Sequence, residues 1–209
     1  MPLYFLRMLP RLYAILDLGL LPTFDALRAC ALELAGAGVT LMQYRAKNVS
    51  PRDMLAHARE LRRILPPDVR LIMNDRADLC VAAGLDGVHV GQDDLSPLGA
   101  RTVVGEGKIV GVSTHNVDQV RLADAVPVDY IAVGPVFATS TKLNPDPVIG
   151  LEGVRSARAL TTKPLVAIGG ITRANCRSVL DAGADSVAVI SDLLNSPAHS
   201  AETFLHILL

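Results

Sequence analysis

Three related segments decide the fold: "ELAGAGVTLMQ" (33–43), "AAGLDGVHV" (82–90) and "DAGADSVAV" (181–189). In each segment an alanine-rich helical stretch closes on glycine, and a β-rich run follows almost at once. Glycine is the usual residue at a helix C-cap, and short loops typically connect a helix to the next strand in α/β proteins. The repeat therefore predicts a chain of successive βα units.

Strands and helices alternate from one end of the sequence to the other. We predict eight strands, over residues 11–17, 39–45, 70–75, 87–91, 108–113, 130–134, 164–170 and 186–191. Most of the stretches between them have helical spacing of apolar residues. Leu27, Cys30, Ala31 and Leu34 share one face of the first, and Leu55, Ala58, Leu61 and Leu65 share one face of the second.

The length of the chain limits the architecture. Eight strands with intervening helices in 209 residues leave no room for a second domain. We therefore expect an α/β protein, a (β/α)8 TIM barrel, as one domain over 1–209, with residues 1–10 as an N-terminal extension of unassigned role. The alternative is an open, doubly wound sheet. That fold would place a GxGxxG fingerprint after the first strand, where "ILDLGLLP" (15–22) offers none.

Composition restricts the possible partners. The formal net charge of −1 gives no electrostatic footprint for nucleic acid or an anionic membrane, so we expect small-molecule partners and leave the oligomeric state open. Cys30, Cys80 and Cys176 form no CxxC pair, which predicts core thiols in a reducing cytoplasm. The apolar start of the chain is interrupted by arginine and proline, so we expect neither a signal peptide nor a membrane anchor.

Polar residues and glycines gather at the carboxyl ends of the predicted strands. Barrel enzymes take their catalytic groups from this end, so these residues predict one shared cleft. They are Gln43, Arg45 and Lys47; Asn74 and Asp75; Asp94; Ser113; the segment "GPVFATSTKLNPDP" (134–147); Gly169 and Gly170; and Ile190 and Ser191.

The side chains of this cleft indicate its ligand. They include the cations Arg45, Lys47 and Lys142, the hydroxyls of Thr139, Ser140 and Thr141, and the carboxylates of Asp75 and Asp94. Two carboxylates beside the cations would repel a phosphate unless a divalent cation stood between them. Mg²⁺ commonly takes one or two carboxylates and completes its shell with phosphate oxygens. The set therefore predicts Mg²⁺ and a pyrophosphate, with the hydroxyls near it.

A second anion site is expected after the last two strands. The glycine pair of "AIGGI" (167–171) precedes a helix for which Thr172 is the expected N-cap, and "VIS" (189–191) ends the last strand nearby. In TIM barrels these loops commonly bind a phosphate through backbone amides and a helix N-terminus.

Each of these residues also has a purely structural interpretation. Arg45 could form a strand-end salt bridge, Asp75 could cap the next helix, and Asp94 could initiate a turn with its neighbour. His89 is flanked by valines and is expected to be a hydrogen-bonded core histidine, and His115 is expected in the first turn of a helix. The coincidence of all these groups at one barrel end favours function.

The motifs, taken in order, resemble those of the thiamine-phosphate synthase family, also called thiamin phosphate pyrophosphorylase. They are "QYRAK" (43–47), "NDRADL" (74–79), "GVHVGQDDL" (87–95), "GVSTH" (111–115), "DYIAVGPVFATSTK" (129–142), "AIGGI" (167–171) and "SVAVIS" (186–191). The resemblance extends from Leu12 to about Leu194. It implies a (β/α)8 barrel that joins hydroxymethylpyrimidine diphosphate to a thiazole phosphate, forming thiamine phosphate and releasing pyrophosphate.

The resemblance also implies residue roles. Gln43, Arg45, Lys47 and Asn74 would hold the pyrimidine diphosphate, Asp75 and Asp94 would bind Mg²⁺, Ser113 would face the pyrimidine, and Lys142 would reach the pyrophosphate. Thr139 and Thr141 would line the thiazole phosphate site with Gly170, Ile190 and Ser191. Residue chemistry alone instead suggests that these threonines lie near the pyrophosphate. We take Lys142, Arg45 and Ser113 as the catalytic residues.

The expected chemistry is loss of pyrophosphate to leave a delocalised pyrimidine cation, which the thiazole nitrogen then captures. The segment "LNPDP" (143–147) is a candidate lid over that cation. Two rival functions remain open. One is a thiazole tautomerase-like paralogue, whose relatives have a histidine where this chain has Pro135, and the other is a non-catalytic sensor of thiamine phosphate.

Overall fold

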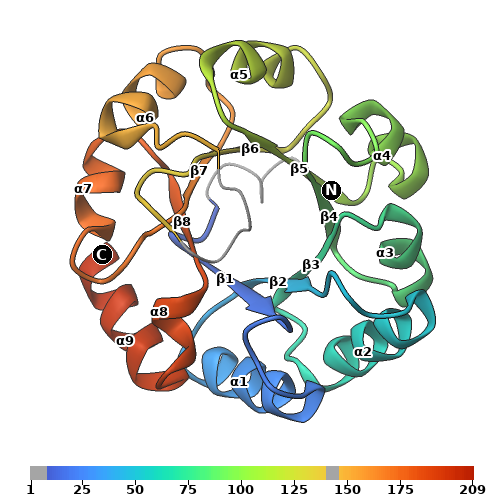
Figure 1. Cartoon of the computed structure of the whole chain (residues 1–209). Coiled ribbons are helices and arrows are strands. Elements are labelled where there is room, and N and C mark those ends of the chain that lie inside the picture. Colours follow the sequence, from blue (N-terminus) through green and yellow to red (C-terminus); the bar gives the residue numbers. More distant parts are fainter. Residues whose placement is uncertain (1–8, 140–145) are drawn as a thin grey trace.

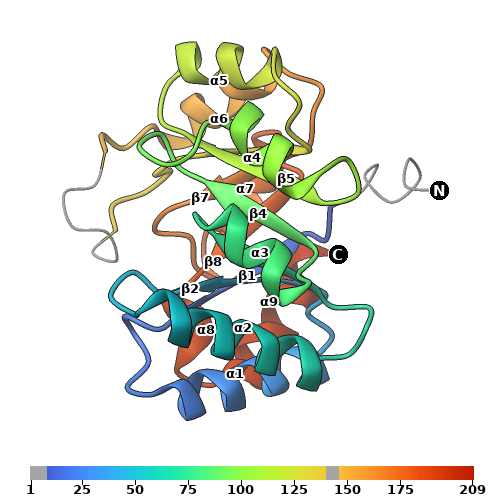
Figure 2. The same ribbon diagram turned by 90° about the vertical axis from the view of Figure 1, so that its right-hand side faces the viewer.

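The computed structural model describes residues 9–139 and 146–209, so the predicted roles of Ser140, Thr141 and Lys142 and most of the candidate lid lie outside the described residues. Eight parallel strands pair in chain order and close into a barrel, with the helices forming an outer ring (Figure 1). The predicted (β/α)8 architecture is confirmed. The side view shows the strands crossing the interior obliquely between the flanking helices (Figure 2).

The strands are β1 (Leu12–Asp17), β2 (Leu41–Arg45), β3 (Arg70–Asn74), β4 (Gly87–Val90), β5 (Ile109–Thr114), β6 (Tyr130–Val133), β7 (Leu165–Ile168) and β8 (Ser186–Val189). The helices are α1 (Phe24–Gly36), α2 (Pro51–Ile64), α3 (Ala77–Ala83), α4 (Pro97–Val104), α5 (Val117–Asp124), α6 (Gly150–Arg158), α7 (Cys176–Asp181), α8 (Ser191–Leu194) and α9 (Pro197–Leu208). Among these described helices, none combines the length and apolar character that crossing a bilayer requires.

Strand β7 is shorter than predicted because the glycine pair after it leaves the extended conformation. Gly169 and Gly170 have φ angles of 101° and 63°, in the left-handed region that glycine tolerates. A Cβ on Gly170 would lie 2.5 Å from the Ala138 carbonyl oxygen and 2.8 Å from Phe137 Cβ. The pair therefore allows the segment after β6 to pack tightly against the end of β7.

The alternation of side chains along each strand divides the apolar residues into two cores. Inside the barrel lies a small core built around Tyr13, Ile72, Tyr130 and Val166. A larger core lies between the barrel and the helices. In α1 all four predicted core residues are buried there.

The predicted face of α2 is partly wrong. Ala58, Leu61 and Leu65 are buried, but Leu55 is only partly buried. Met54, which was not predicted, is buried in its place.

Three Asp–Arg clasps join the strands to the helices at the amino-terminal end of the barrel. In each clasp, an aspartate just before a strand accepts a hydrogen bond from a backbone amide of the strand before it. The same aspartate forms an ion pair with an arginine of the helix that precedes that earlier strand. Asp86 binds the Leu71 amide and Arg62 of α2, Asp129 binds the Val110 amide and Arg101 of α4, and Asp185 binds the Leu165 amide and Arg158 of α6. The clasps repeat every two βα units. They fix the end of the barrel opposite the predicted cleft.

Candidate active site

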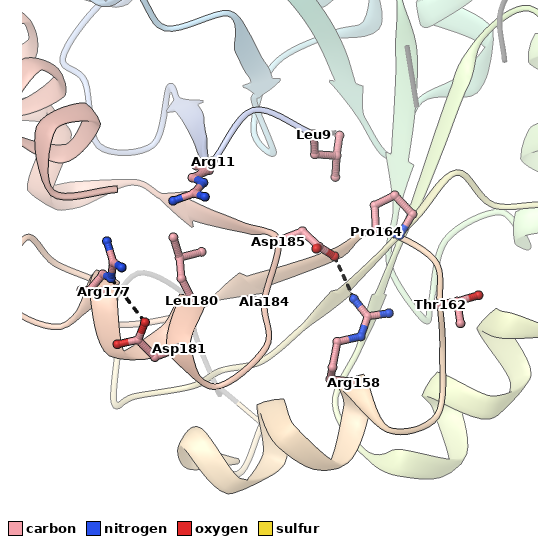
Figure 3. A pocket seen from close by; sticks show the side chains of 10 residues that line it. All are labelled: Leu9, Arg11, Arg158, Thr162, Pro164, Arg177, Leu180, Asp181, Ala184 and Asp185. Atoms are coloured by element: carbon pink, nitrogen blue, oxygen red, sulfur yellow. Dashed lines mark hydrogen bonds and ion pairs between the residues drawn. The ribbon is translucent and has the colours of Figure 1, made fainter. Parts of the chain in front are cut away.

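One cavity, of about 570 Å³, lies at the amino-terminal end of the barrel. Its three arginines already have protein partners, and Figure 3 draws the ion pairs of two of them, Arg158 and Arg177. Arg158 lies 2.8 Å from Asp185, Arg177 lies 3.3 Å from Asp181, and Arg11 donates to backbone carbonyls at the end of α9. This cavity contains none of the predicted site residues, and we do not take it as the active site.

The second cavity, of about 440 Å³, opens at the carboxyl ends of the strands. Nine of the residues with a predicted substrate- or metal-binding role line it: Gln43, Arg45, Lys47, Asn74, Asp75, Asp94, Ser113, Thr139 and Ile190. Within the described chain, Gly170 and Ser191 are not among its lining residues, although their neighbours Gly169 and Ile190 are. The geometry therefore brings most of the predicted cleft together.

One edge of the cavity carries the two predicted metal-binding carboxylates. Burial raises the pKa of the Asp75 carboxyl, and the neighbouring Asp94 carboxylate raises it further. A hydrogen bond from Lys47 opposes this rise, since its Nζ lies 2.5 Å from Asp75 Oδ2. Asp94 Oδ2 accepts a hydrogen bond from the Gly91 amide at 2.8 Å. Two like charges in one partly buried place favour the binding of a cation.

The structure argues against a simple capping role for Asp75. Helix α3 begins at Ala77, its N-cap is Arg76, and no side chain caps it. Asp75 itself has a φ of 62°, a left-handed conformation that is uncommon outside glycine. Strain of this kind is often found at functional sites. Here it directs the carboxylate toward Lys47.

The donor set fits Mg²⁺ that is bound together with a ligand. Among the described residues there is no group of three histidine, cysteine, aspartate or glutamate side chains that could enclose a metal ion. Asp75 and Asp94 therefore provide two carboxylates at most from this edge. Mg²⁺ typically uses one or two carboxylates and completes six oxygen contacts with water and phosphate. A diphosphate at this edge would complete such a shell.

Arg45 forms the strand-end ion pair that was considered as its structural alternative, and it also lines the cavity. Its Nη1 lies 2.5 Å from Oδ2 of Asp17, which is buried at the end of β1. A guanidinium has five N–H donors, so this contact leaves others for a ligand. Sequence reasoning missed Asp17, although a carboxylate ending the apolar run "YAILD" (13–17) is a usable signal.

A chain of hydrogen bonds between side chains, four of which border the cavity, links five strands. Gln43 Nε2 donates to Tyr13 Oη at 2.8 Å, and Tyr13 Oη lies 3.0 Å from Tyr130 Oη. Tyr130 Oη lies 2.9 Å from His89 Nδ1, and His89 Nε2 lies 2.8 Å from Ser113 Oγ. We call these five residues the inner network. His89 is thus the hydrogen-bonded core histidine that was expected, whereas both tyrosines were missed.

The inner network makes the stability of the protein sensitive to acid. Burial lowers the pKa of His89 from 6.5 to about 4, so between these pH values the unfolded chain binds a proton that the folded chain does not. The free energy of unfolding should therefore fall as the pH drops through this window, by up to about 3 kcal/mol from this group. Urea unfolding at pH 7 and pH 4.5 should show a smaller fall for His89→Gln than for the wild type. Equal falls would contradict this prediction.

His115 borders the cavity but does not lie in the first turn of a helix as expected. Helix α5 begins at Val117, and the Asn116 side chain caps it by accepting a hydrogen bond from the Gln119 amide. His115 Nδ1 lies 2.7 Å from the Gly134 carbonyl oxygen, and Nε2 lies 3.4 Å from Asp146 Oδ2. The ring therefore joins the end of β5 to both sides of the β6–α6 connection.

The expected helix cap after β7 is wrong. Helix α7 begins at Cys176, with Asn175 rather than Thr172 at the N-cap. The Asn175 side chain instead holds the preceding turn: Oδ1 accepts from the Thr172 amide at 2.8 Å, and Nδ2 donates to the Gly170 carbonyl at 3.0 Å. The turn moves the start of α7 away from the glycine pair.

Comparison with known proteins gives a consistent result. A family model described as thiamine monophosphate synthase matches residues 12–193. The thiamine-phosphate synthase of Koribacter versatilis is 63% identical over 203 residues, covering 96% of each chain. That of Chloroflexus aurantiacus is 44% identical over 182 residues, or 87% of this chain and 83% of the relative. The solved thiamine phosphate pyrophosphorylase of Pyrococcus furiosus is similar with a TM-score of 0.83 at 32% identity, covering 95% of both chains. This chain belongs to the thiamine monophosphate synthase family.

Proposed function

We propose that this chain is a thiamine-phosphate synthase, a transferase that joins hydroxymethylpyrimidine diphosphate to a thiazole phosphate and releases pyrophosphate. The observation that carries the proposal is the convergence of Arg45, Lys47, Asp75 and Asp94 on one edge of the cavity at the carboxyl ends of the strands. This edge supplies two cations and two carboxylates, as a diphosphate bound with Mg²⁺ requires. Its substrates are small molecules.

The proposed reaction exchanges one bond for another. The carbon–oxygen bond between the pyrimidine methylene and the diphosphate breaks, and the electron pair leaves with pyrophosphate. The thiazole nitrogen then donates its lone pair to the methylene carbon, so the new carbon–nitrogen bond forms without an external oxidant or base. The main requirement on the protein is to stabilise the charge that develops on the leaving group and to hold the nucleophile in line.

The residues at the diphosphate edge meet this requirement. Arg45 and Lys47 place positive charge beside the leaving group, with Lys142 in the same proposed role from outside the described residues. Asp75 and Asp94 would hold Mg²⁺, which when bound neutralises charge on the diphosphate oxygens. Gln43, Asn74 and Ser113 are proposed to contact the rest of this substrate.

The thiazole phosphate is proposed to bind on the β6 to β8 side of the same cavity. Thr139 and Ile190 line that side, and the proposed contacts of Gly170, Ser191 and Thr141 complete the set. Since the start of α7 lies away from the glycine pair, we place this phosphate near the ends of β7 and β8 rather than at that helix.

The remaining expectations accord with this function. The three cysteines are buried free thiols, as expected for a protein of the reducing cytoplasm, which we propose as its location. We propose that this chain forms one barrel domain. A thiazole tautomerase-like activity is not favoured, because the relatives that cover nearly the whole chain carry the synthase name.

The function is tested by incubating the purified protein with both substrates and Mg²⁺ and measuring thiamine phosphate and pyrophosphate. Equal amounts of the two products are expected. Chelation with EDTA should stop turnover, and added Mg²⁺ should restore it, because the described residues offer two carboxylates at this edge and no group that would enclose a metal ion. Product formation that persists unchanged in EDTA would refute the proposed metal requirement, and absence of thiamine phosphate with Mg²⁺ would refute the function.

A further inference from the structure

The inner network determines which hydrogen-bonding groups face the cavity. Burial raises the pKa of both Tyr13 and Tyr130, so each phenol keeps its single proton at neutral pH. His89 is buried, and its two ring nitrogens each lie beside a hydroxyl group rather than a carboxylate, so we take its imidazole as neutral. Each of these three side chains therefore brings one hydrogen to the network, and each hydrogen can serve one bond.

The direction of the bonds follows when each of these three hydrogens is used within the network. Gln43 donates to Tyr13, so the Tyr13 proton is available for Tyr130, and the Tyr130 proton for His89 Nδ1. With Nδ1 accepting, the neutral imidazole carries its hydrogen on Nε2 and donates it to Ser113 Oγ. All four bonds then have one donor and one acceptor.

Four members of the inner network line the cavity, namely Gln43, Tyr13, His89 and Ser113, and Tyr130 lies fully buried behind them. Of these four, the end residues Gln43 and Ser113 each make only one bond within the network. Gln43 uses its amide nitrogen inward, which leaves its carbonyl oxygen as the acceptor for a ligand. Ser113 accepts from His89, which leaves its hydroxyl proton as the donor for a ligand. The cavity thus offers an acceptor from β2 and a donor from β5.

Resting on the proposed function, we propose that Tyr13, Tyr130 and His89 are positioning residues that select an aminopyrimidine over an oxopyrimidine. An aminopyrimidine edge has an amino donor for Gln43 and a ring-nitrogen acceptor for Ser113. The oxo analogue reverses this pattern, with an oxygen acceptor and a ring N–H donor. Binding it would set its oxygen against the Gln43 carbonyl oxygen and leave the Ser113 hydroxyl proton without an acceptor, unless the Gln43 amide flipped and the bonds of the network reversed.

The space around Tyr130 supports a dedicated role for this side chain. Its ring lies against Gly111 of β5, where an added Cβ would be only 2.0 Å from Tyr130 Cζ. The ring also stacks on His89, with centroids 5.5 Å apart. The Tyr130 hydroxyl is thereby held between Tyr13 and His89.

The test compares kcat/KM for the 4-amino pyrimidine diphosphate with that for its 4-oxo analogue. Tyr130→Phe removes only the hydroxyl that joins the two halves of the network, so Gln43 and Ser113 can orient independently. The amino-to-oxo selectivity ratio is expected to fall by about tenfold, mostly through a weaker reaction of the amino substrate. Tyr13→Phe should lower the amino-to-oxo selectivity ratio by a similar factor. This second variant provides the test if Tyr130→Phe does not fold.

Tyr44→Phe is the matched control. Tyr44 also bonds a histidine, His57 Nδ1 at 2.7 Å, but on the helix side of the barrel. The amino-to-oxo selectivity ratio of Tyr44→Phe should stay at the wild-type value. Unchanged ratios in Tyr130→Phe and Tyr13→Phe, in a wild type that makes thiamine phosphate, would overturn this inference alone. A wild type that makes no thiamine phosphate would overturn the proposed function instead.

Discussion

Asp75→Asn should lower kcat/KM for thiamine phosphate formation by about 10²- to 10³-fold, which is the usual cost of losing one group that stabilises developing charge. The substitution removes a carboxylate from the proposed metal site and leaves Lys47, now 2.5 Å from a neutral amide, without its counter-charge. We expect most of the loss in kcat, because the charge on the leaving group is greatest in the transition state. Steady-state kinetics across a Mg²⁺ titration measures the effect.

Asparagine is the appropriate replacement because of the backbone at this position. Asp75 has a φ of 62°, a conformation that asparagine tolerates and alanine does not. Alanine would add a backbone penalty to the loss of charge. Asparagine keeps the size, the backbone and one side-chain oxygen, so the change in rate reports on charge.

Asp78→Asn provides the control for Asp75→Asn. Asp78 lies three residues away in the first turn of α3, and its carboxylate pairs with Arg76 on the exposed surface. The same chemical change there should leave kcat/KM within about twofold of the wild type, because exposed ion pairs contribute little. Wild-type kcat/KM for Asp75→Asn at saturating Mg²⁺ would show that Asp75 has another role.

The barrel was predictable because its signal is periodic. The helix–glycine–strand repeat recurs along the chain, and the predicted strands agree with those observed to within a few residues. The cleft was predictable for a related reason: parallel strands in a barrel bring their carboxyl ends together, so polar residues such as Asp75 and Asp94 must meet once the strands are placed.

The inner network was not predictable in the same way. Tyr13 and Tyr130 occur in apolar runs, where an aromatic residue normally indicates packing rather than hydrogen bonding. Their hydroxyls meet across the barrel, 117 residues apart in the sequence. Only the closure of the barrel brings these two strands opposite one another.

The predicted helix cap after β7 was wrong for a local reason. Both Thr172 and Asn175 are good N-cap residues, so composition alone does not select between them. The structure uses the Asn175 side chain to close the turn from Gly170 to Thr172, and the helix starts later in consequence. Competition between side-chain and helical hydrogen bonds decides such cases.

The largest expected effect on stability comes from the middle Asp–Arg clasp. Asp129→Ala should lower the free energy of unfolding by about 3 kcal/mol, because removal of one partner of a buried ion pair leaves an uncompensated charge. Arg101 is 8% exposed, and its Nη2 lies 2.5 Å from Asp129 Oδ2. The same oxygen accepts from the Val110 amide at 2.7 Å, so the start of β5 also loses a bond.

Two further variants separate the parts of this effect, each followed by urea unfolding at neutral pH. Asp129→Asn keeps an oxygen for the Val110 amide but removes the charge, so its loss should fall between those of the wild type and Asp129→Ala. Asp118→Ala breaks an exposed pair with Arg121 on α5 and should cost less than about 1 kcal/mol. The carbonyls of Gly105 and Lys108 also accept hydrogen bonds from Arg101. If Asp129→Ala lowered the free energy of unfolding no more than Asp118→Ala, these carbonyls would have to stabilise the guanidinium without the aspartate. The repeated placement of aspartate before β4, β6 and β8 would then have no basis in stability.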